Sequence, residues 1–247
     1  MSIPKMRKRT DLFDASSFEV LKKAEDTYFW FCVRRKWIFA SIAKYKAPPA
    51  NVLEIGCGTG NVSSFLARQG YAVTGCEYHN EALDIAWPGF TKVCADGAQV
   101  PFDDSSFDVV GLFDVIEHTP DDLQMVNEAA RLLKKGGIII VTVPAREELW
   151  SWLDEVSYHK RRYSKEMLNT LFSEALLDVV CLEYMFMSLY LPMKLARKHH
   201  KDPSDTFKIN TIANMVMRGV TETERMISRI IPLPIGTSLL AVAKKRS

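Results

Sequence analysis

The sequence predicts an α/β fold in which a mostly parallel, doubly wound sheet carries helices on both faces. Two observations predict it. Short apolar runs alternate with helical stretches between residues 51 and 143, which is the pattern of successive βαβ units. The run at 138–143 is almost wholly β-branched, as in a central strand covered on both faces. With 247 residues, the chain is long enough for one domain whose core needs neither disulfides nor a metal.

Helices are expected ahead of the sheet. Apolar and aromatic residues recur at three- and four-residue spacing between Ser17 and Tyr45, which predicts one or two amphipathic helices. Pro48 and Pro49 then break the pattern. The alternating region is expected to contain, in order, strand 51–55, helix 62–69, strand 72–77, helix 81–86, strand 92–95, strand 107–113, helix 122–133 and strand 137–143.

Capping signals place the later elements. Gly136 and Gly137 after two lysines indicate a helix stop. Ser164 is a predicted N-cap, with Glu166 in the first turn of a helix that reaches residue 176. A strand at 179–186, a mostly helical stretch at 189–231 with a polar interruption at 199–205, and a last strand at 238–243 follow.

We expect one domain in four parts. They are an N-terminal helical lid (1–47), a Rossmann-like core (48–187), a helical cap insertion (188–232) and a final strand with its tail (233–247).

Composition excludes several classes of protein. Hydrophobic residues make up 47% and charged residues 25% of the chain, and the net charge is +2. This is the balance of a globular protein and lacks the basic surplus of a dedicated nucleic-acid binder. The five cysteines show no metal-ligand spacing, so we expect thiols and no metal site. No apolar segment resembles a signal peptide or a membrane span, which predicts a cytoplasmic protein.

The most informative stretch is a strand that runs into Gly56, Gly58 and Gly60. Glycines at a strand end let backbone approach a ligand closely, at the sheet edge where nucleotide-like cofactors bind. A dinucleotide site would instead use G-x-G-x-x-G to hold a pyrophosphate. Here Glu54 precedes the loop, where it would repel a pyrophosphate and help to hold a cationic amino-acid and sulfonium group. Glu77 ends the second strand, where it can accept hydrogen bonds from ribose hydroxyls.

With this loop, the chain resembles the class I S-adenosylmethionine-dependent methyltransferases, particularly the small-molecule branch (methyltransferase type 11) similar to the ubiquinone and menaquinone methylases. The resemblance covers residues 51–143. It implies a seven-stranded sheet of order 3-2-1-4-5-7-6 with an antiparallel last strand, and S-adenosylmethionine as cofactor. The positions it assigns to cofactor binding are Glu54, Gly56, Cys57, Gly58, Gly60, Glu77, Tyr78, Asp96, Gly97, Ala98, Phe113 and Asp114.

Two histidines are candidates for catalysis. Methyl transfer from a sulfonium is an in-line displacement that depends mainly on alignment in a desolvated pocket, so no metal is required. A hydroxyl acceptor benefits from a general base, for which histidine is suited. His118 follows the fourth strand and His159 follows the fifth. The alternatives are a histidine bonded to backbone at a helix start for His118, and a solvated charged run for His159.

Aromatic and basic residues outside the core are candidates for the acceptor site. Tyr28, Trp30, Arg34 and Arg35 resemble an N-terminal feature of methyltransferases of bacterial sugar, lipopolysaccharide and secondary-metabolite pathways, and can equally form a core stripe with solvated arginines. Arg161 and Tyr163 belong to an H-x-R-R-Y-S pattern that recurs in bacterial relatives. We expect transfer to an oxygen or nitrogen of a small molecule, such as a sugar or lipid-linked metabolite, by a monomer or homodimer.

The segment 185–201 mixes methionine and leucine with a basic cluster that includes Arg197 to Lys201. Such a segment can contact an anionic membrane or a lipid-linked substrate, or can simply pack as part of a cap.

Three other functions remain open at this stage. One is a nicotinamide-dependent oxidoreductase, which the glycine spacing disfavours. Another is a non-catalytic partner subunit that keeps the fold. The last is a methyltransferase acting on RNA or protein, which the modest charge and the stretch Phe113 to Ile116 disfavour.

Overall fold

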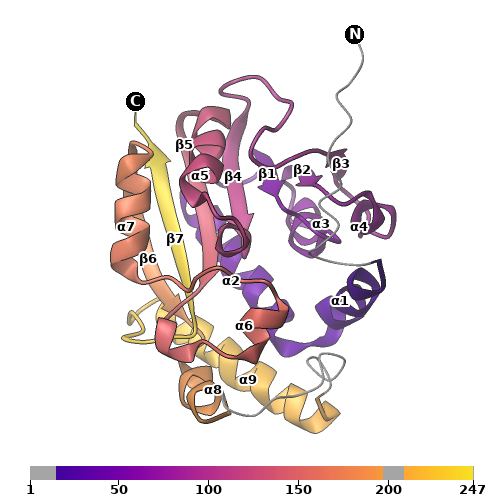
Figure 1. Cartoon of the computed structure of the whole chain (residues 1–247), viewed down its shortest axis with the longest axis vertical. Helices are drawn as coiled ribbons and strands as arrows, with labels where there is room; N and C mark the ends of the chain where they lie inside the picture. Colours follow the sequence, from indigo (N-terminus) through magenta and orange to yellow (C-terminus); the bar gives the residue numbers. More distant parts are fainter. Residues whose placement is uncertain (1–14, 197–208, 247) are drawn as a thin grey trace.

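A seven-stranded sheet of order β3-β2-β1-β4-β5-β7-β6 organises the chain. The computed structural model describes residues 15–196 and 209–246. Strands β1 to β5 run parallel, and β7 is antiparallel to both β5 and β6. The predicted strand order and the antiparallel last strand are therefore confirmed (Figure 1). The strands are β1 (Asn51–Ile55), β2 (Ala72–Glu77), β3 (Thr91–Cys94), β4 (Phe107–Phe113), β5 (Leu133–Pro144), β6 (Leu177–Met185) and β7 (Ser238–Lys245).

Helices cover both faces of the sheet, and two precede it. The α-helices are α1 (Ala15–Thr27), α2 (Phe29–Tyr45), α3 (Asn61–Arg68), α4 (Asn80–Asp84), α5 (Asp122–Leu132), α6 (Trp152–Val156), α7 (Lys165–Glu174), α8 (Tyr190–Ala196) and α9 (Thr211–Ser228). Short 3-10 turns are η1 (Ile116–His118), η2 (Glu147–Leu149) and η3 (Met187–Leu189).

The strand residues alternate between two hydrophobic cores. One core joins the sheet to α5 and α7, with Leu53 and Leu112 among its buried strand residues. The other joins the opposite face to α2 and α3, with Val52 and Ile140. The N-terminal helix α2 thus closes one face of the sheet, because its apolar side packs over strands that are distant in the sequence.

Several element bounds differ from the expectations by one to four residues, the largest difference being at β5, which begins at Leu133 and not at residue 137. Helix α5 ends at Leu132, and Lys134 lies in β5, where its Nζ contacts the Asp108 carboxylate at 3.0 Å rather than the helix end. Strand β6 begins at 177, two residues early. Helix α6 was not expected, although Ser151 and Asp154 form a capping box at its start. The predicted polar interruption and most of the basic cluster lie outside the described residues.

Over the described ranges, no helix combines the length and apolarity needed to cross a bilayer.

Candidate active site

A cavity of about 910 Å³ lies at the carboxyl edge of the parallel strands. The loops that follow β1, β2, β3 and β4 form its floor, and residues of α1, α2 and α6 form its walls. In Figure 1, α1 and α6 lie beyond the ends of the parallel strands, and α2 runs from there behind the sheet. This is where ligands bind in an open α/β sheet.

The glycine loop leaves its backbone open to the cavity. Gly56, Gly58 and Gly60 all have positive φ angles, of +72°, +54° and +76°. A Cβ atom added to Gly60 would lie 2.2 Å from Phe90 Cζ, whereas one added to Gly58 would meet nothing within 4 Å. Gly58 lines the cavity and Gly60 does not. Gly60 therefore serves packing, and the open side of Gly58 lets a ligand approach the backbone.

Backbone amides hold the Glu77 carboxylate at the cavity wall. Glu77 Oε2 accepts a hydrogen bond from Gly58 N at 2.9 Å, and Oε1 accepts from the amides of Tyr78 at 2.8 Å and His79 at 3.0 Å. The side chain is buried and lines the cavity. A carboxylate has about four lone-pair sites, so a site remains for a hydroxyl of a bound ligand.

A second carboxyl, Glu54, lies at the end of β1 under the same loop. It is buried and accepts a hydrogen bond from the Ser63 hydroxyl of α3. Burial raises the pKa of Glu54 to about 7, although the Ser63 hydrogen bond opposes the shift. A cation placed beside Glu54 would favour its charged form.

The loops after β3 and β4 complete the floor of the cavity. Asp96, Gly97 and Ala98 line it, and Asp96 Oδ1 also accepts from Ala98 N at 2.9 Å, which fixes the turn. Phe113 and Asp114 line it from the end of β4, as do Cys57 and Tyr78 from the neighbouring loops. Of the predicted cofactor positions, every one except Gly60 therefore meets at this cavity.

The predicted substrate residue Arg34 forms an ion pair with the predicted cofactor residue Asp114. The Arg34 guanidinium also donates to Thr142 Oγ1 at 3.3 Å and lies 5.0 Å from the Trp30 ring centroid. Trp30, Arg34 and Asp114 line the cavity. Asp114 thus balances the Arg34 charge, and the pair joins α2 to the end of β4.

Sequence reasoning missed Glu25, a buried residue of α1 that lines the cavity. Its carboxylate accepts hydrogen bonds from the Thr59 hydroxyl of the glycine loop and from Trp87 Nε1. Burial raises its pKa. The contact connects α1 directly to the loop. In the sequence, Glu25 is indistinguishable from the other charged residues of an amphipathic helix.

His118 and His159 lie side by side at the far end of the cavity. Their ring centroids are 4.8 Å apart, and both line the cavity. His159 Nδ1 lies 2.8 Å from Asp154 Oδ1, which orients the ring. Burial lowers the pKa of His118 to about 4, and His159 adds to the shift. His118 is therefore neutral and weakly basic near pH 7.

The buried Glu117 completes this histidine cluster. Desolvation and the nearby Asp114 raise its pKa well above the usual range. Neither carboxylate oxygen has a hydrogen-bond partner among the described residues. One donor atom each of Glu117, His118 and His159 lie within 4.8 Å of one another, an arrangement that could hold a divalent cation. The sequence had predicted no metal site.

Four predicted substrate residues do not line the cavity. The guanidinium of Arg161 lies 2.9 Å from Asp122, and the buried Tyr163 hydroxyl donates to the same carboxylate at 2.8 Å. Both side chains therefore fasten the segment after α6 to α5. Arg35 lies over the Phe65 ring, and Tyr28 packs on its neighbour Phe29.

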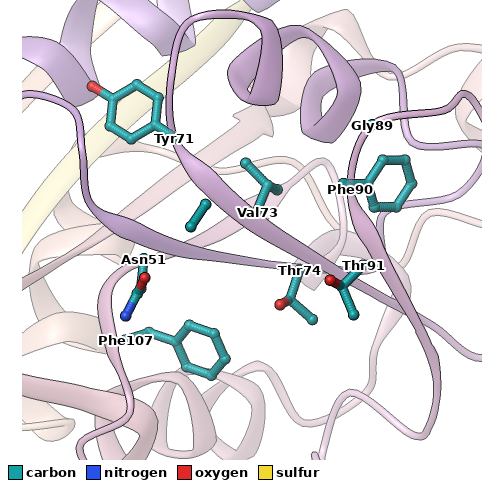
Figure 2. Close-up of a pocket in the computed structure, with 9 residues that line it drawn as sticks. Asn51, Tyr71, Val73, Thr74, Gly89, Phe90, Thr91 and Phe107 are labelled. Atoms are coloured by element: carbon teal, nitrogen blue, oxygen red, sulfur yellow. The ribbon is translucent and has the colours of Figure 1, made fainter.

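A second hollow, of about 430 Å³, lies at the opposite edge of the sheet. Figure 2 shows it between the starts of β1, β2, β3 and β4, with Asn51, Thr74, Thr91 and Phe107 around it. None of its lining side chains is charged. It offers no acid, base or ion pair for chemistry, so the cavity at the carboxyl edge is the candidate active site.

Known proteins match the part of the chain that contains the parallel strands. Residues 53–141 match a family described as methyltransferase domain. A protein of Mycolicibacterium smegmatis described as an S-adenosylmethionine-dependent methyltransferase is 33% identical over 126 residues, which cover 50% of this chain and 48% of the relative. A ubiquinone biosynthesis O-methyltransferase of Idiomarina loihiensis is 28% identical over 153 residues, which cover 52% and 62%. The chain spans about half the length of the curated relatives it matches.

Solved structures share the fold over nearly the whole chain. One comes from a complex between the Haloferax volcanii Trm112 methyltransferase activator and a protein described as a methyltransferase, with a TM-score of 0.65, 21% identity and coverage of 96% of this chain and 97% of that one. Another is phosphoethanolamine N-methyltransferase 2 of Haemonchus contortus in complex with S-adenosyl-L-methionine, with a TM-score of 0.64, 17% identity and coverage of 97% and 59%.

Proposed function

Because this chain contains a class I S-adenosylmethionine-dependent methyltransferase domain, we propose that the whole protein transfers a methyl group from S-adenosylmethionine to an oxygen or nitrogen of a small molecule. The observation that carries the proposal is the pairing of Glu77, held by three amides, with the open side of Gly58 at one cavity. A carboxylate beside open backbone fits a ribose and its neighbouring groups. S-adenosylmethionine supplies an activated methyl group on its sulfonium.

In this proposal each residue of the site has a separate role. Glu77 accepts from a ribose hydroxyl, Asp96 faces the adenine amino group, and Glu54 stabilises the cationic end of the cofactor. His159, oriented by Asp154, takes the proton of a hydroxyl acceptor, and the weakly basic His118 shapes the pocket beside it. Helices α1 and α2 serve as the lid over the cavity, and α8 and α9 serve as a cap.

The nature of the acceptor is the finer part of the proposal. The cavity beside the cofactor positions is walled by Trp30 and Phe31 together with Leu153 and Val156, which favours an acceptor with an apolar portion, such as a lipid-linked metabolite.

The five free thiols support a reducing, cytoplasmic setting.

Titration calorimetry with S-adenosylhomocysteine and, separately, with NADH tests the cofactor assignment. We expect binding of the homocysteine product and no heat with NADH. Binding of NADH alone would refute the proposal in favour of an oxidoreductase. Binding of neither would favour a non-catalytic subunit. Methyl transfer from labelled S-adenosylmethionine to small lipid-linked or sugar acceptors then tests turnover, and transfer to RNA or protein alone would contradict a small-molecule acceptor.

Two glycine substitutions should separate packing from binding. Alanine at Gly58 or Gly60 costs about 1–2 kcal/mol for the left-handed backbone, but only Gly60→Ala also clashes with Phe90, which adds about 1–3 kcal/mol. We expect Gly60→Ala to lower the free energy of unfolding more in urea titrations. Gly58→Ala should stay folded and lose most of its affinity for S-adenosylhomocysteine. Equal stability of the two variants, or normal binding by Gly58→Ala, would contradict this division.

Cofactor binding is expected to release a proton near neutral pH. The pKa of Glu54 is raised to about 7, so the free protein holds this carboxyl protonated below pH 7 and ionised above. The ammonium group of the ligand favours the ionised form, and affinity for S-adenosylhomocysteine should therefore rise as pH increases through about 7. Calorimetry at neutral pH, in buffers of different ionisation enthalpy, measures the release. Glu54→Gln should abolish it, and an unchanged release in that variant would exclude Glu54 as the source.

A further inference from the structure

Helix α9 is inverted relative to an ordinary surface helix, because its polar side chains face the protein. Asn214 Oδ1 accepts from Phe29 N at 2.9 Å, and its Nδ2 donates to Thr27 O at 2.8 Å. The Glu224 carboxylate accepts from the amides of η3, Met187 N at 2.6 Å and Ser188 N at 2.8 Å. The buried residues of α9 are all polar. Hydrogen bonds, together with the packing of Met217 against the core, thus fix the orientation of the helix on α2 and η3.

The opposite side of α9 presents apolar side chains to solvent. Ile212 is 71% exposed, Met215 67% and Ile230 84%. The exposed apolar residues within α9 recur at three- and four-residue spacing, which places them on one side of the helix, and Ile230 and Ile231 lie just after its end at Ser228. We call this surface the outer stripe; its members are Ile212, Met215, Val216, Val220, Met226, Ile227, Ile230 and Ile231. Contiguous exposed apolar surface of this kind marks an interaction site.

Helix α8 extends the same end of the molecule. Its residues Leu191 and Leu195 are 65% and 78% exposed, and both α8 and α9 contact η3. The two helices lie at the lower end of the molecule in Figure 1, with the sheet above them. Exposed apolar side chains of both helices therefore lie at this end of the molecule, and both helices contact η3.

Among the described residues of α8 and α9, the exposed charged side chains are cationic. Arg218 and Arg229 of α9 and Lys194 of α8 are exposed. Of the two acidic residues of α9, Glu224 is buried and Glu222 is partly exposed and paired. Glu222 forms ion pairs with Lys36 at 3.2 Å and with Arg225 at 2.8 Å, and Glu224 accepts the amides of η3. The outward surface of α9 thus combines apolar side chains with exposed cations, while both of its acids are held in ion pairs or hydrogen bonds.

We propose that the outward surface of α8 and α9 docks on an anionic lipid bilayer, with α9 lying in the plane of the interface. Apolar side chains enter the headgroup boundary while flanking arginines contact anionic headgroups. A second copy of the chain fits less well, because a two-fold contact would bring the same cationic surface against itself with no exposed acid of α9 to balance it.

Docking would have a consequence for the proposed function. Helix α9 packs on α2, and α2 contributes Trp30 and Arg34 to the cavity. A bilayer under α9 would thus lie close to the apolar wall of the cavity and give a lipid-linked acceptor a short path. Only this last step rests on the proposed function. The docking itself does not.

Flotation of the full chain with lipid vesicles tests the proposal. We expect binding to phosphatidylcholine vesicles that contain about 30% phosphatidylglycerol, weaker binding to pure phosphatidylcholine, and loss of binding at high salt. Met215→Glu together with Ile230→Glu should abolish binding. Arg218→Gln together with Arg229→Gln should lower the partition coefficient about tenfold or more. The matched control is Met167→Glu on α7, an exposed helical methionine at a different surface, which should bind like the unmodified chain.

The outcomes are separable from those of the methyltransferase proposal. S-adenosylhomocysteine binding should be unchanged in both double variants, which shows that they are folded. The docking proposal is overturned if the unmodified chain does not float with anionic vesicles, or if Met215→Glu with Ile230→Glu floats equally well. It is also overturned if light scattering shows a dimer that this double variant converts to a monomer while vesicle binding is absent.

Discussion

Replacing Glu77 by alanine is expected to weaken S-adenosylhomocysteine binding by about tenfold to a hundredfold, because the one charge-assisted hydrogen bond that its open site accepts from ribose contributes about 1.5–3 kcal/mol. The substitution also removes the acceptor of three backbone amides, those of Gly58, Tyr78 and His79, which donate to Glu77 in the unmodified chain. The glycine loop should therefore lose its fixed geometry as well. Titration calorimetry gives the affinity directly.

The control for this experiment is Glu174→Ala, an exposed glutamate at the end of α7, which should bind normally. Glu77→Gln keeps one acceptor oxygen and should lie between the two. A Glu77→Ala variant that is folded and binds within about threefold of the unmodified chain would show that Glu77 only supports the loop, since about 0.7 kcal/mol is below one such hydrogen bond.

The second large effect is on stability. Asp154 is buried and accepts from His159 Nδ1 at 2.8 Å and from Arg162 at 2.8 and 3.0 Å. Asp154→Ala leaves the buried Arg162 guanidinium without its carboxylate, and breaking a buried pair costs about 3–5 kcal/mol. We expect a loss of this size in the free energy of unfolding, measured in urea.

An exposed ion pair of the same type provides the comparison. Asp178 and Arg246 are 3.0 Å apart, with side chains 59% and 53% exposed, so Asp178→Ala should cost less than about 1 kcal/mol. Asp154→Asn, which keeps the size of the side chain, separates positioning from folding. If the variant folds, methyl transfer to a hydroxyl acceptor should fall while S-adenosylhomocysteine binding persists. Equal losses of stability for Asp154→Ala and Asp178→Ala would contradict a buried network.

The core of the fold could be predicted because its signals are local. Strand residues such as Val52 and Ile140 are buried on a covered sheet, so their apolar runs stand out in the sequence. Boundaries were less certain. Strand β5 begins at Leu133, which pairs with Phe107 of β4, and Lys134 contacts Asp108 of the same strand; such contacts between distant residues leave no local signal. The start of helix α6 does have a local signal in the sequence, the capping box of Ser151 and Asp154.

The candidate site was predictable where residues follow strand ends and not where distant helices meet them. Topology brings Gly58, Glu77 and Asp96 to one edge, so strand order alone places them together. The Arg34 contact with Asp114 and the Glu25 contact with Thr59 depend on how α1 and α2 pack. The inverted orientation of α9 was likewise invisible, because an amphipathic pattern does not say which side faces the protein.

The hydrogen bond from the Thr59 hydroxyl to Glu25 couples the packing of α1 to the geometry of the glycine loop. A ligand that fixes the loop is expected to stabilise the packing of α1 as well, and by reciprocity this contact of α1 raises the affinity for that ligand. Amide hydrogen exchange in α1 and the dissociation constant of the ligand should therefore report the same coupling free energy. A change at this one carboxylate can thus alter ligand affinity through the loop.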